Sequence, residues 1–473
     1  MNALPKLTKL LVALALAWAS AAMAADRSVW PLTPYRVEVY VAVAAELPAA
    51  PRLETALCAD LATRIEAVIG APWNATVSSA PPKLRDALLH GLTGLQSDQV
   101  PLPPPEVDKL LLVAVTAVPG GMRVTARDFD VRTRTLSPAV ARPVWQLGAL
   151  GDAALDAMLS AFAPLARIER VDKDQMFLRA KASALPPRDR NLALVREGDV
   201  FRPIIRYNDR DNKFRRTAPA RWSFCPVEKV SPDEVRCQIY SGMRSELTTK
   251  GRGRIEPLAL KVVPPSGSTL LLLQSKSEPK TPLAGYEVYT HPPGQKTALT
   301  LVGRTDRQGR LVVSPGQDLL RVLLLKNGNA NLARLPIVPG LEPRLTAVIP
   351  NDDQRLGAEG FILGLREEVT DVYVRRKILM MRIHSRIEKK QFDQAAAFFD
   401  ALRGLPTAEQ FNMRLAHEQD RLASTDPSVQ RKINTLLSDT RLLIDKQLDP
   451  QEIEDLDQDL HNAGGGDRKT ADE

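Results

Sequence analysis

The chain has 473 residues, of which 44% are hydrophobic and 25% charged, with a formal net charge of +8. This length predicts three or four domains, each able to bury its own core. Three cysteines exclude a disulfide framework of the kind that holds small secreted domains together.

The N-terminus predicts a secretory signal peptide over residues 1–25. Lys6 and Lys9 precede an apolar run from Leu10 to Ala19, and the triplet Ala22-Met23-Ala24 provides an A-x-A cleavage site. The run is about ten residues long, whereas about 20 are needed to span a bilayer. No later segment is long and apolar enough to span one. We therefore expect an exported mature chain, either periplasmic or extracellular.

Residues 26–165 alternate strand and helix patterns, which predicts an α+β domain with one sheet. Residues 36–43 alternate with period two, as in a strand, and a helix follows between Pro51 and Gly70. The apolar run Lys109–Val118 turns at Pro119-Gly120-Gly121 into a second alternating run, a hairpin pattern. A last helix is expected over 152–162.

Residues 166–262 predict a small β-barrel of five or six short strands. "ARIERVDKDQMFLRA" and "LVREGDVFRPIIRY" each show two strand patterns around a turn. An α+β module that ends in a helix and continues into "ARIE…VREGDVF" resembles periplasmic assembly factors of the flagellar T-protein type. This resemblance covers residues 26–262 and implies a role in envelope assembly.

A linker over 263–268, rich in Pro, Ser and Gly, leads into seven short strand patterns over 269–351. Regular spacing with Pro and Gly between the strands predicts a β-sandwich. "PLAGYEVYT" followed by "TDRQG" resembles the carboxypeptidase-regulatory or prealbumin-like sandwich, which implies a fold and no catalysis. We interpret Asp306–Gly309, between two apolar runs, as a type I turn of a hairpin, since Asp and Gly occupy the positions that this turn favours.

Residues 352–461 are expected to be helical. Val372, Leu379, Ile383 and Ile387 form one apolar stripe, and "KKQFDQAAAFFDALRGLP" resembles a tetratricopeptide-type helix pair. Residues 462–473, in which three glycines follow Ala463, predict a disordered tail.

The chain as a whole resembles a group of uncharacterised exported proteins of planctomycete-type bacteria. "PYRVEVYVAV", "REGDVFRPIIRYNDR" and "LAGYEVYTHPPG" carry this resemblance. It implies export and a multidomain architecture, and it implies no activity.

The sequence offers no catalytic, cofactor-binding or metal-binding residues. Its five histidines stand at no metal-ligand spacing, and the patterns of serine-hydrolase and nucleotide-binding loops do not occur. Asp209 and Asp211 begin like a calcium loop, but the sixth-position glycine and twelfth-position glutamate are missing. A polar hairpin turn is the preferred interpretation there.

One chemical signal stands above the background, a concentration of basic residues. Between 166 and 262, 22 Lys and Arg residues stand against 13 Asp and Glu residues. On one face they would attract polyanions, and guanidinium groups suit carboxylates and phosphates. The alternative is a set of solvated turns with local ion pairs. The candidate anion- or partner-binding residues are Arg202, Arg206, Arg210, Lys213, Arg215 and Arg216.

Two of the cysteines, Cys225 and Cys237, lie on either side of a turn at Ser231–Glu234. A disulfide between two hairpin strands is one interpretation, and two unpaired thiols are the other.

Three functions remain open from the sequence. The first is a non-enzymatic multidomain adaptor of the cell envelope, because binding-type modules follow one another without an assembled active site. The second is a hydrolase of an envelope polymer with an accessory sandwich. The third is a polyanion- or carbohydrate-binding protein that uses the basic region. Partners are expected among envelope proteins and anionic envelope polymers rather than nucleic acids.

Overall fold

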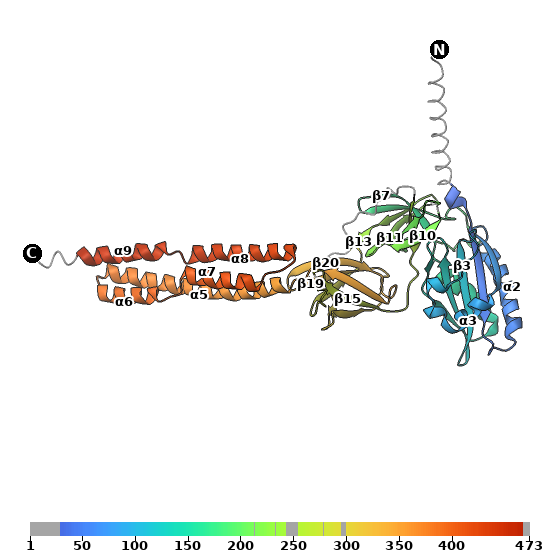
Figure 1. Ribbon diagram of the computed structural model, residues 1–473, viewed down its shortest axis with the longest axis horizontal. Coiled ribbons are helices and arrows are strands. Elements are labelled where there is room, and N and C mark those ends of the chain that lie inside the picture. Colours follow the sequence, from blue (N-terminus) through green and yellow to red (C-terminus); the bar gives the residue numbers. More distant parts are fainter. Residues whose placement is uncertain are drawn as a thin grey trace, which may run out of the picture.

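The computed structural model describes residues 29–211, 213–231, 233–242, 254–277, 279–294 and 299–466. The predicted signal peptide and most of the predicted tail lie outside these residues. The molecule is elongated: an α+β domain and a barrel occupy one end, a β-sandwich follows, and a helical rod extends to the other end (Figure 1). The predicted fold class, multidomain α+β with these four parts, is confirmed.

The N-terminal domain is built on a six-stranded sheet in the order β2-β1-β3-β4-β5, with β6 also paired to β4. β1 runs parallel to β2 and β3, and β3 and β4 form the predicted antiparallel hairpin. The strands are β1 (Tyr35–Val43), β2 (Trp73–Ser79), β3 (Lys109–Val118), β4 (Gly121–Asp130), β5 (Thr135–Leu136) and β6 (Val140–Val144).

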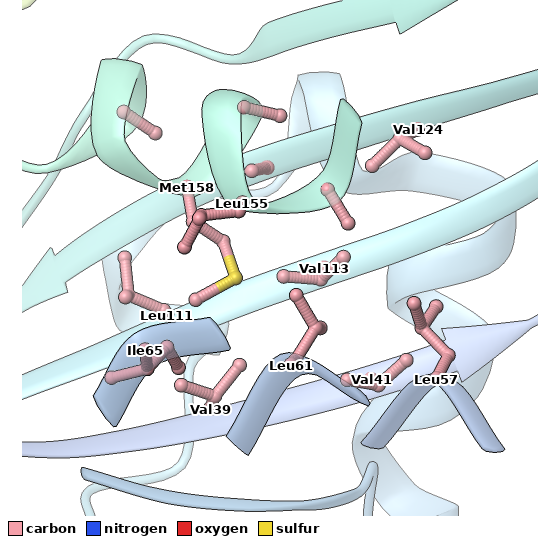
Figure 2. Close-up of a cluster of buried hydrophobic side chains, with 14 of the residues drawn as sticks. Val39, Val41, Leu57, Leu61, Ile65, Leu111, Val113, Val124, Leu155 and Met158 are labelled. Atoms are coloured by element: carbon pink, nitrogen blue, oxygen red, sulfur yellow. The ribbon is translucent and has the colours of Figure 1, made fainter. Parts of the chain in front are cut away.

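Helices cover both faces of this sheet. α2 (Ala50–Val68) and α4 (Leu150–Ala161) pack on one face, and α3 (Pro82–Gly91) packs on the other. Leu57, Leu61 and Ile65 recur every four residues, so they lie in one stripe of α2. Figure 2 shows this stripe facing Val39 and Val41 of β1. Helices on both sides explain why β3 is an almost continuous apolar run.

A lysine lies at the centre of the junction between this domain and the barrel. The Lys109 Nζ contacts the Asp128 Oδ2 at 3.0 Å and the Asp130 Oδ2 at 2.9 Å, and all three side chains are buried. The Nζ also donates to the Ala163 carbonyl oxygen at 2.5 Å, just before the first barrel strand. Burial alone would lower the pKa of Lys109, but the two carboxylates outweigh it and raise that pKa. The lysine therefore stays charged and joins β3, β4 and the barrel entrance.

We predict that Lys109→Met destabilises this junction, because two carboxylates remain buried without their cation. Breaking a buried ion pair costs about 3–5 kcal/mol. Hydrogen exchange of the β3 and β4 amides, followed by mass spectrometry, measures this loss as faster exchange. Arg142→Met is the control: it breaks the exposed pair with Asp156 on the same domain and is expected to cost at most about 1 kcal/mol. Equal effects of the two substitutions would contradict the role given to Lys109.

The basic region forms a closed barrel of six strands. The order β9-β14-β7-β8-β12-β11 closes because β11 also pairs with β9, and β10 and β13 extend the barrel at its edges. The prediction of five or six strands is thus confirmed at six. The strands are β7 (Leu165–Asp172), β8 (Gln175–Ala180), β9 (Val200–Asn208), β10 (Phe214–Pro219), β11 (Ser223–Val230), β12 (Val235–Gln238), β13 (Tyr240–Ser241) and β14 (Ile255–Lys261).

The predicted sandwich has its seven strands in two sheets, ordered β18-β15-β21 and β17-β16-β19-β20. The Asp306 carbonyl accepts a hydrogen bond from the Gly309 N–H at 2.9 Å, and Gly309 has a φ of +70°. Asp306–Gly309 is therefore the predicted turn, but the prediction of a hairpin is wrong, because the strands on its two sides, β17 and β18, belong to different sheets and do not pair. The strands are β15 (Thr269–Ser275), β16 (Glu287–His291), β17 (Thr300–Arg304), β18 (Arg310–Val313), β19 (Arg321–Asn327), β20 (Ala330–Ile337) and β21 (Arg344–Ile349).

Five helices form the rod, residues 353–466, in which α5 runs beside α6 and α8. The predicted helix pair is present as α5 and α6. None of the described helices is long and apolar enough to cross a membrane. The helices are α5 (Asp353–Glu388), α6 (Phe392–Arg403), α7 (Ala408–Arg421), α8 (Pro427–Gln447) and α9 (Gln451–Gly466).

The prediction of a disordered tail from residue 462 is wrong at its start, because α9 continues to Gly466. Leu456 is buried and Leu460 packs in the same cluster with α6. The N–H groups of a helix bond to carbonyls four residues earlier. The packed turn at Leu460 therefore supports the turn that follows it, even though glycine is a poor helix former.

Candidate functional site

A cleft of about 440 Å³ lies between the barrel and the sandwich. This volume is within the range of ligand-binding clefts, about 300–1,000 Å³. The barrel contributes β9, the end of β10, the start of β11 and the segment between these last two strands. The sandwich contributes the end of β20, the start of β21 and the turn between them. The lining residues are Arg202, Pro219, Arg221, Trp222, Phe224, Pro336, Ile337, Val338, Leu341, Glu342, Arg344, Leu345 and Thr346.

A small hydrophobic cluster joins the two domains beside the cleft. Val200, Phe224 and Val262 of the barrel pack with Leu320 and Val338 of the sandwich. These residues are buried, so the contact is dry. It fixes how the two walls of the cleft face each other.

Trp222 reaches from the barrel onto the core of the sandwich. Its ring packs against the cluster that contains Leu335 and Ile337. Its backbone has a φ of +53°, in the left-handed region, where bulky residues are rare. Its carbonyl accepts a hydrogen bond from the Gly242 N–H at 2.8 Å. The surrounding contacts hold this strained backbone, and the ring forms part of the cleft wall.

Gly242 permits the close approach of the two domains. A Cβ at this position would lie 2.7 Å from the Arg334 carbonyl oxygen of β20 and 3.2 Å from the Trp222 Cβ. Contacts this short are not tolerated, so the smallest residue is required here.

We therefore predict that Gly242→Ala moves the barrel away from β20 and exposes the Trp222 ring. Fluorine NMR of the 5-fluorotryptophan-labelled protein measures this as a shift of the Trp222 resonance. Gly267→Ala is the matched control, because a Cβ there meets nothing within 4 Å. An unchanged Trp222 resonance in the Gly242 variant would contradict the close-packed contact.

Arg202 of the barrel contacts Glu342 of the sandwich across the cleft. Its guanidinium forms an ion pair with the Glu342 carboxylate, and 18% of the Arg202 side chain is exposed. The backbone of Glu342 is fixed in turn, since its carbonyl accepts a hydrogen bond at 2.7 Å from the buried Thr269 hydroxyl. The Arg202 Nε is buried and has no hydrogen-bond partner among the described residues. The pair thus joins the domains and leaves one donor unused.

The cleft carries an excess of positive charge. Arg221 and Arg344 are exposed at its rim, and neither has a carboxylate partner among the residues that the structure describes. Among the described lining residues Glu342 alone is acidic, and Arg202 already pairs with it. An anionic group that enters the cleft therefore meets two uncompensated guanidinium groups beside the rings of Trp222 and Phe224.

The structure places the six predicted basic residues on one hairpin, β9–β10, but not in one site. Arg202 alone lines the cleft. Arg206 lies four residues further along the same face of β9, about 13 Å away at the rise of a strand. There it stacks near the Phe214 ring and donates to the Asn208 Oδ1 at 3.0 Å and to the Arg132 carbonyl oxygen at 3.2 Å. Burial lowers its pKa, and Arg132 lowers it further.

The surroundings of Arg206 explain it as part of the junction with the N-terminal domain. Arg132 forms a two-pronged contact with Glu256 of β14, at 2.6 and 2.9 Å. Arg132 and Arg167 also stack over the ring of Trp30, at 5.4 and 4.1 Å from its centroid. These cations hold two domains together, so they do not form a free binding surface.

The other four predicted residues lie toward the tip and the outer edge of the hairpin. Arg210 and Lys213 are exposed in its turn, and Arg215 and Arg216 are exposed on β10. The guanidinium of Arg216 stacks on the Tyr207 ring at 4.4 Å. The Asp209 carboxylate accepts hydrogen bonds from the N–H groups of Asp211 and Lys213. This is the polar hairpin turn that we preferred to a calcium loop.

Arg344 is the lining residue that the sequence reasoning missed. Arg221 and Trp222 belong to the basic region that the sequence singled out, whereas Arg344 belongs to a different domain. No pattern along the chain indicates that these positions meet. Within the described ranges, no group of three or more His, Cys, Asp or Glu residues is arranged to hold a metal ion.

Both cysteines of the proposed disulfide are free thiols in the structure. Across the β11–β12 ladder Cys237 pairs with Val227, so Cys225 is offset by two residues and does not stand opposite it. Both are buried. Burial raises the pKa of Cys225 well above the ordinary value and that of Cys237 to about 12.

We predict that Cys225 and Cys237 remain reduced and unreactive in the folded chain. A buried thiol with a raised pKa carries almost no thiolate at neutral pH, and the thiolate is the reactive form. Alkylation without reducing agent, followed by mass spectrometry, should label both residues only after denaturation. A mass two hydrogens lower, with neither residue labelled in denaturant, would instead show that they are bridged.

Comparison with known proteins does not assign this chain to a family. No family model and no curated protein matches the chain. Among solved structures, the Bacillus anthracis TIE protein shares 12% identity at a TM-score of 0.14, over 45% of this chain and 46% of that one. TolB from Acinetobacter baumannii shares 10% identity at a TM-score of 0.18, over 68% of this chain and 96% of that one. The chain thus spans less than half of the TIE protein, and TM-scores this low carry no argument. The family resemblances stay predictions.

Proposed function

We propose that this protein is an exported, non-enzymatic adaptor of the cell envelope, and that it binds its partner in the cleft between barrel and sandwich. The observation that carries the proposal is the lining of this cleft. It combines two aromatic rings with two guanidinium groups and a buried donor that have no partner among the described residues. Polar groups of this kind in an otherwise apolar cleft are what fix the orientation of a ligand.

The architecture supports the adaptor part of the proposal. Four modules follow one another along the molecule (Figure 1). The end of β20 and the start of β21 line the cleft, whereas the rod follows the other end of β21. A rod of this kind separates whatever binds at its far end from whatever binds in the cleft. The predicted signal peptide assigns the chain to the periplasm or to the outside of the cell.

A second candidate function rests on a different surface. Arg210, Lys213, Arg215 and Arg216 are all exposed on the β9–β10 hairpin. A polyanion, such as an acidic glycan, would bind to this surface by summed charge. Charge reversal of Arg210, Arg215 and Arg216 separates the two candidates, because these residues do not line the cleft.

The proposed function is tested in the cells that make the protein, with a photo-crosslinking amino acid at position 346 or 312. Thr346 lines the cleft, whereas Val312 is 56% exposed on β18, at the other edge of the same sheet. We expect crosslinks to an envelope component from position 346 and none from position 312. The double variant Arg221→Glu/Arg344→Glu should reduce the crosslinks from position 346 at least about tenfold, the equivalent of 1.4 kcal/mol.

The control for charge is Arg307→Glu/Arg310→Glu, which changes the net charge equally at exposed positions outside the cleft. Equal crosslinking from both positions, or from neither, contradicts the cleft as the binding site. N-terminal sequencing of the chain recovered outside the cytoplasm should begin near Ala25. A chain that keeps Met1 and stays in the cytoplasm contradicts the assignment to the envelope.

A further inference from the structure

We propose that the ligand of the cleft is an extended, acidic peptide segment of a partner protein, which adds as a strand to the free edge of β21. This inference rests on the proposed function, since it specifies the partner of the same cleft. It is carried by the backbone of β21 and by the charges around it.

β21 is the edge strand of its sheet, because within the described residues it pairs with β15 and with no other strand. An edge strand presents a row of N–H and C=O groups without partners. Proteins use such edges to bind extended peptides, whose main chain supplies the affinity while alternate side chains supply the specificity.

Two hydrogen bonds show which backbone groups of β21 point outward. The Leu270 N–H donates to the Pro343 carbonyl at 2.8 Å, and the Lys276 N–H donates to the Ile349 carbonyl at 2.7 Å. Successive residues of a strand direct these groups to opposite edges, so the odd-numbered residues of β21 bond to β15. The N–H and C=O groups of Arg344, Thr346 and Val348 therefore face the free edge.

This free edge borders the cleft. Arg344, Leu345 and Thr346 are consecutive, and all three line it. Side chains of consecutive strand residues point to opposite faces of a sheet. If only one face of the sheet bordered the cleft, only every second residue of β21 would line it. Three consecutive residues line it, so the edge of the strand itself is turned toward the cleft.

The opposite wall is closed to strand addition. β20 is also an edge strand, but it contacts β11 and β13 of the barrel. The carbonyl of its Arg334 is approached closely by Gly242, and its Pro336 has no N–H to donate. An added strand in the cleft therefore has one backbone to pair with, which is that of β21.

The charges select an acidic segment. Arg344 is exposed on β21 itself, Arg221 is exposed on the barrel wall, and Glu342 is already paired with Arg202. A carboxylate on the added strand meets guanidinium forks that suit its geometry. Between the acidic residues, apolar side chains on the other face of the segment meet Trp222 and Leu345, which line the cleft. Alternating acidic and apolar residues match both requirements.

The probe is a fluorescein-labelled eight-residue peptide of alternating Glu and Val, titrated by fluorescence anisotropy into the mature chain at low salt. We expect saturable binding, and we expect no binding of the peptide in which Lys replaces Glu. A peptide with the same side chains and N-methyl groups on alternate residues keeps the charge and loses backbone donors. When the N-methyl groups are on the residues whose N–H groups would face β21, the affinity of the peptide should fall at least about tenfold. The reason is that several main-chain hydrogen bonds of about 1 kcal/mol each are lost.

Two proline variants, one on each edge of the sheet, test whether the peptide pairs with β21. Thr346→Pro removes an outward N–H and no bond to β15, so we expect at least about a tenfold loss of affinity. Val312→Pro is its counterpart on β18: it lies outside the hydrogen-bonded pairs of the β15–β18 ladder, at the opposite edge of the sheet. This variant should bind like the unmodified protein. The N-methylated peptides test the same point on the unmodified protein, so the result does not depend on the folding of a variant.

Several outcomes overturn the inference. Binding that is insensitive to both N-methylation and Thr346→Pro would show attraction by charge alone. Binding of phosphatidylglycerol vesicles or heparin, lost in Arg221→Glu/Arg344→Glu, together with no peptide binding, would identify a polyanion as the ligand. If the peptide does not bind while crosslinks from position 346 persist, the strand inference fails and the proposed function stands. If the crosslinks fail as well, both fail.

Discussion

A buried or half-buried basic side chain paired with a carboxylate fixes each of the three junctions along the molecule. Lys109 joins the N-terminal sheet to the entrance of the barrel. Arg202 joins the barrel to the turn before β21. Arg355, which is buried at the start of α5, binds Asp352 and donates to the Asn327 carbonyl of the sandwich at 2.8 Å. Each pair lies where two hydrophobic cores end, and each holds one module in one orientation to the next.

Such pairs contribute orientation rather than net stability. Removing two charges from water costs about as much as their attraction returns, whereas apolar contact stabilises without direction. Apolar contact alone, as in the cluster around Phe224 and Val338, would allow the barrel to slide over the sandwich. The Arg202–Glu342 pair, in contrast, requires one arrangement of the barrel and the sandwich. Because the two walls of the cleft come from the two domains, the shape of the binding site depends on this pair.

The amino-acid sequence predicts the elements and modules well, because their signals are local. The four-residue repeat of Leu57, Leu61 and Ile65 is a property of one helix, and the strand over 109–118 matches its predicted bounds. The cleft was not predictable, since Trp222 and Arg344 are far apart in the chain and meet through a domain contact. The basic residues drew attention to the correct strand, but only Arg202 of the six belongs to the site. Arg206, with the same sequence signal, is used at another junction, and no local pattern distinguishes the two.

An open strand edge can pair with another copy of itself and so promote aggregation. The sequence around β21 limits this risk and still leaves the edge open. Pro343 and Pro350 bound the strand, so that the edge without proline is only six residues long. Arg344 places a charge at its first exposed position, which opposes pairing with a second copy of the same edge. The barrel wall then covers the side from which a flat sheet would approach. The cleft leaves this edge open on one side, and the charge that repels another β21 edge attracts an acidic one. The features that protect this edge from aggregation are therefore the same features that select its ligand.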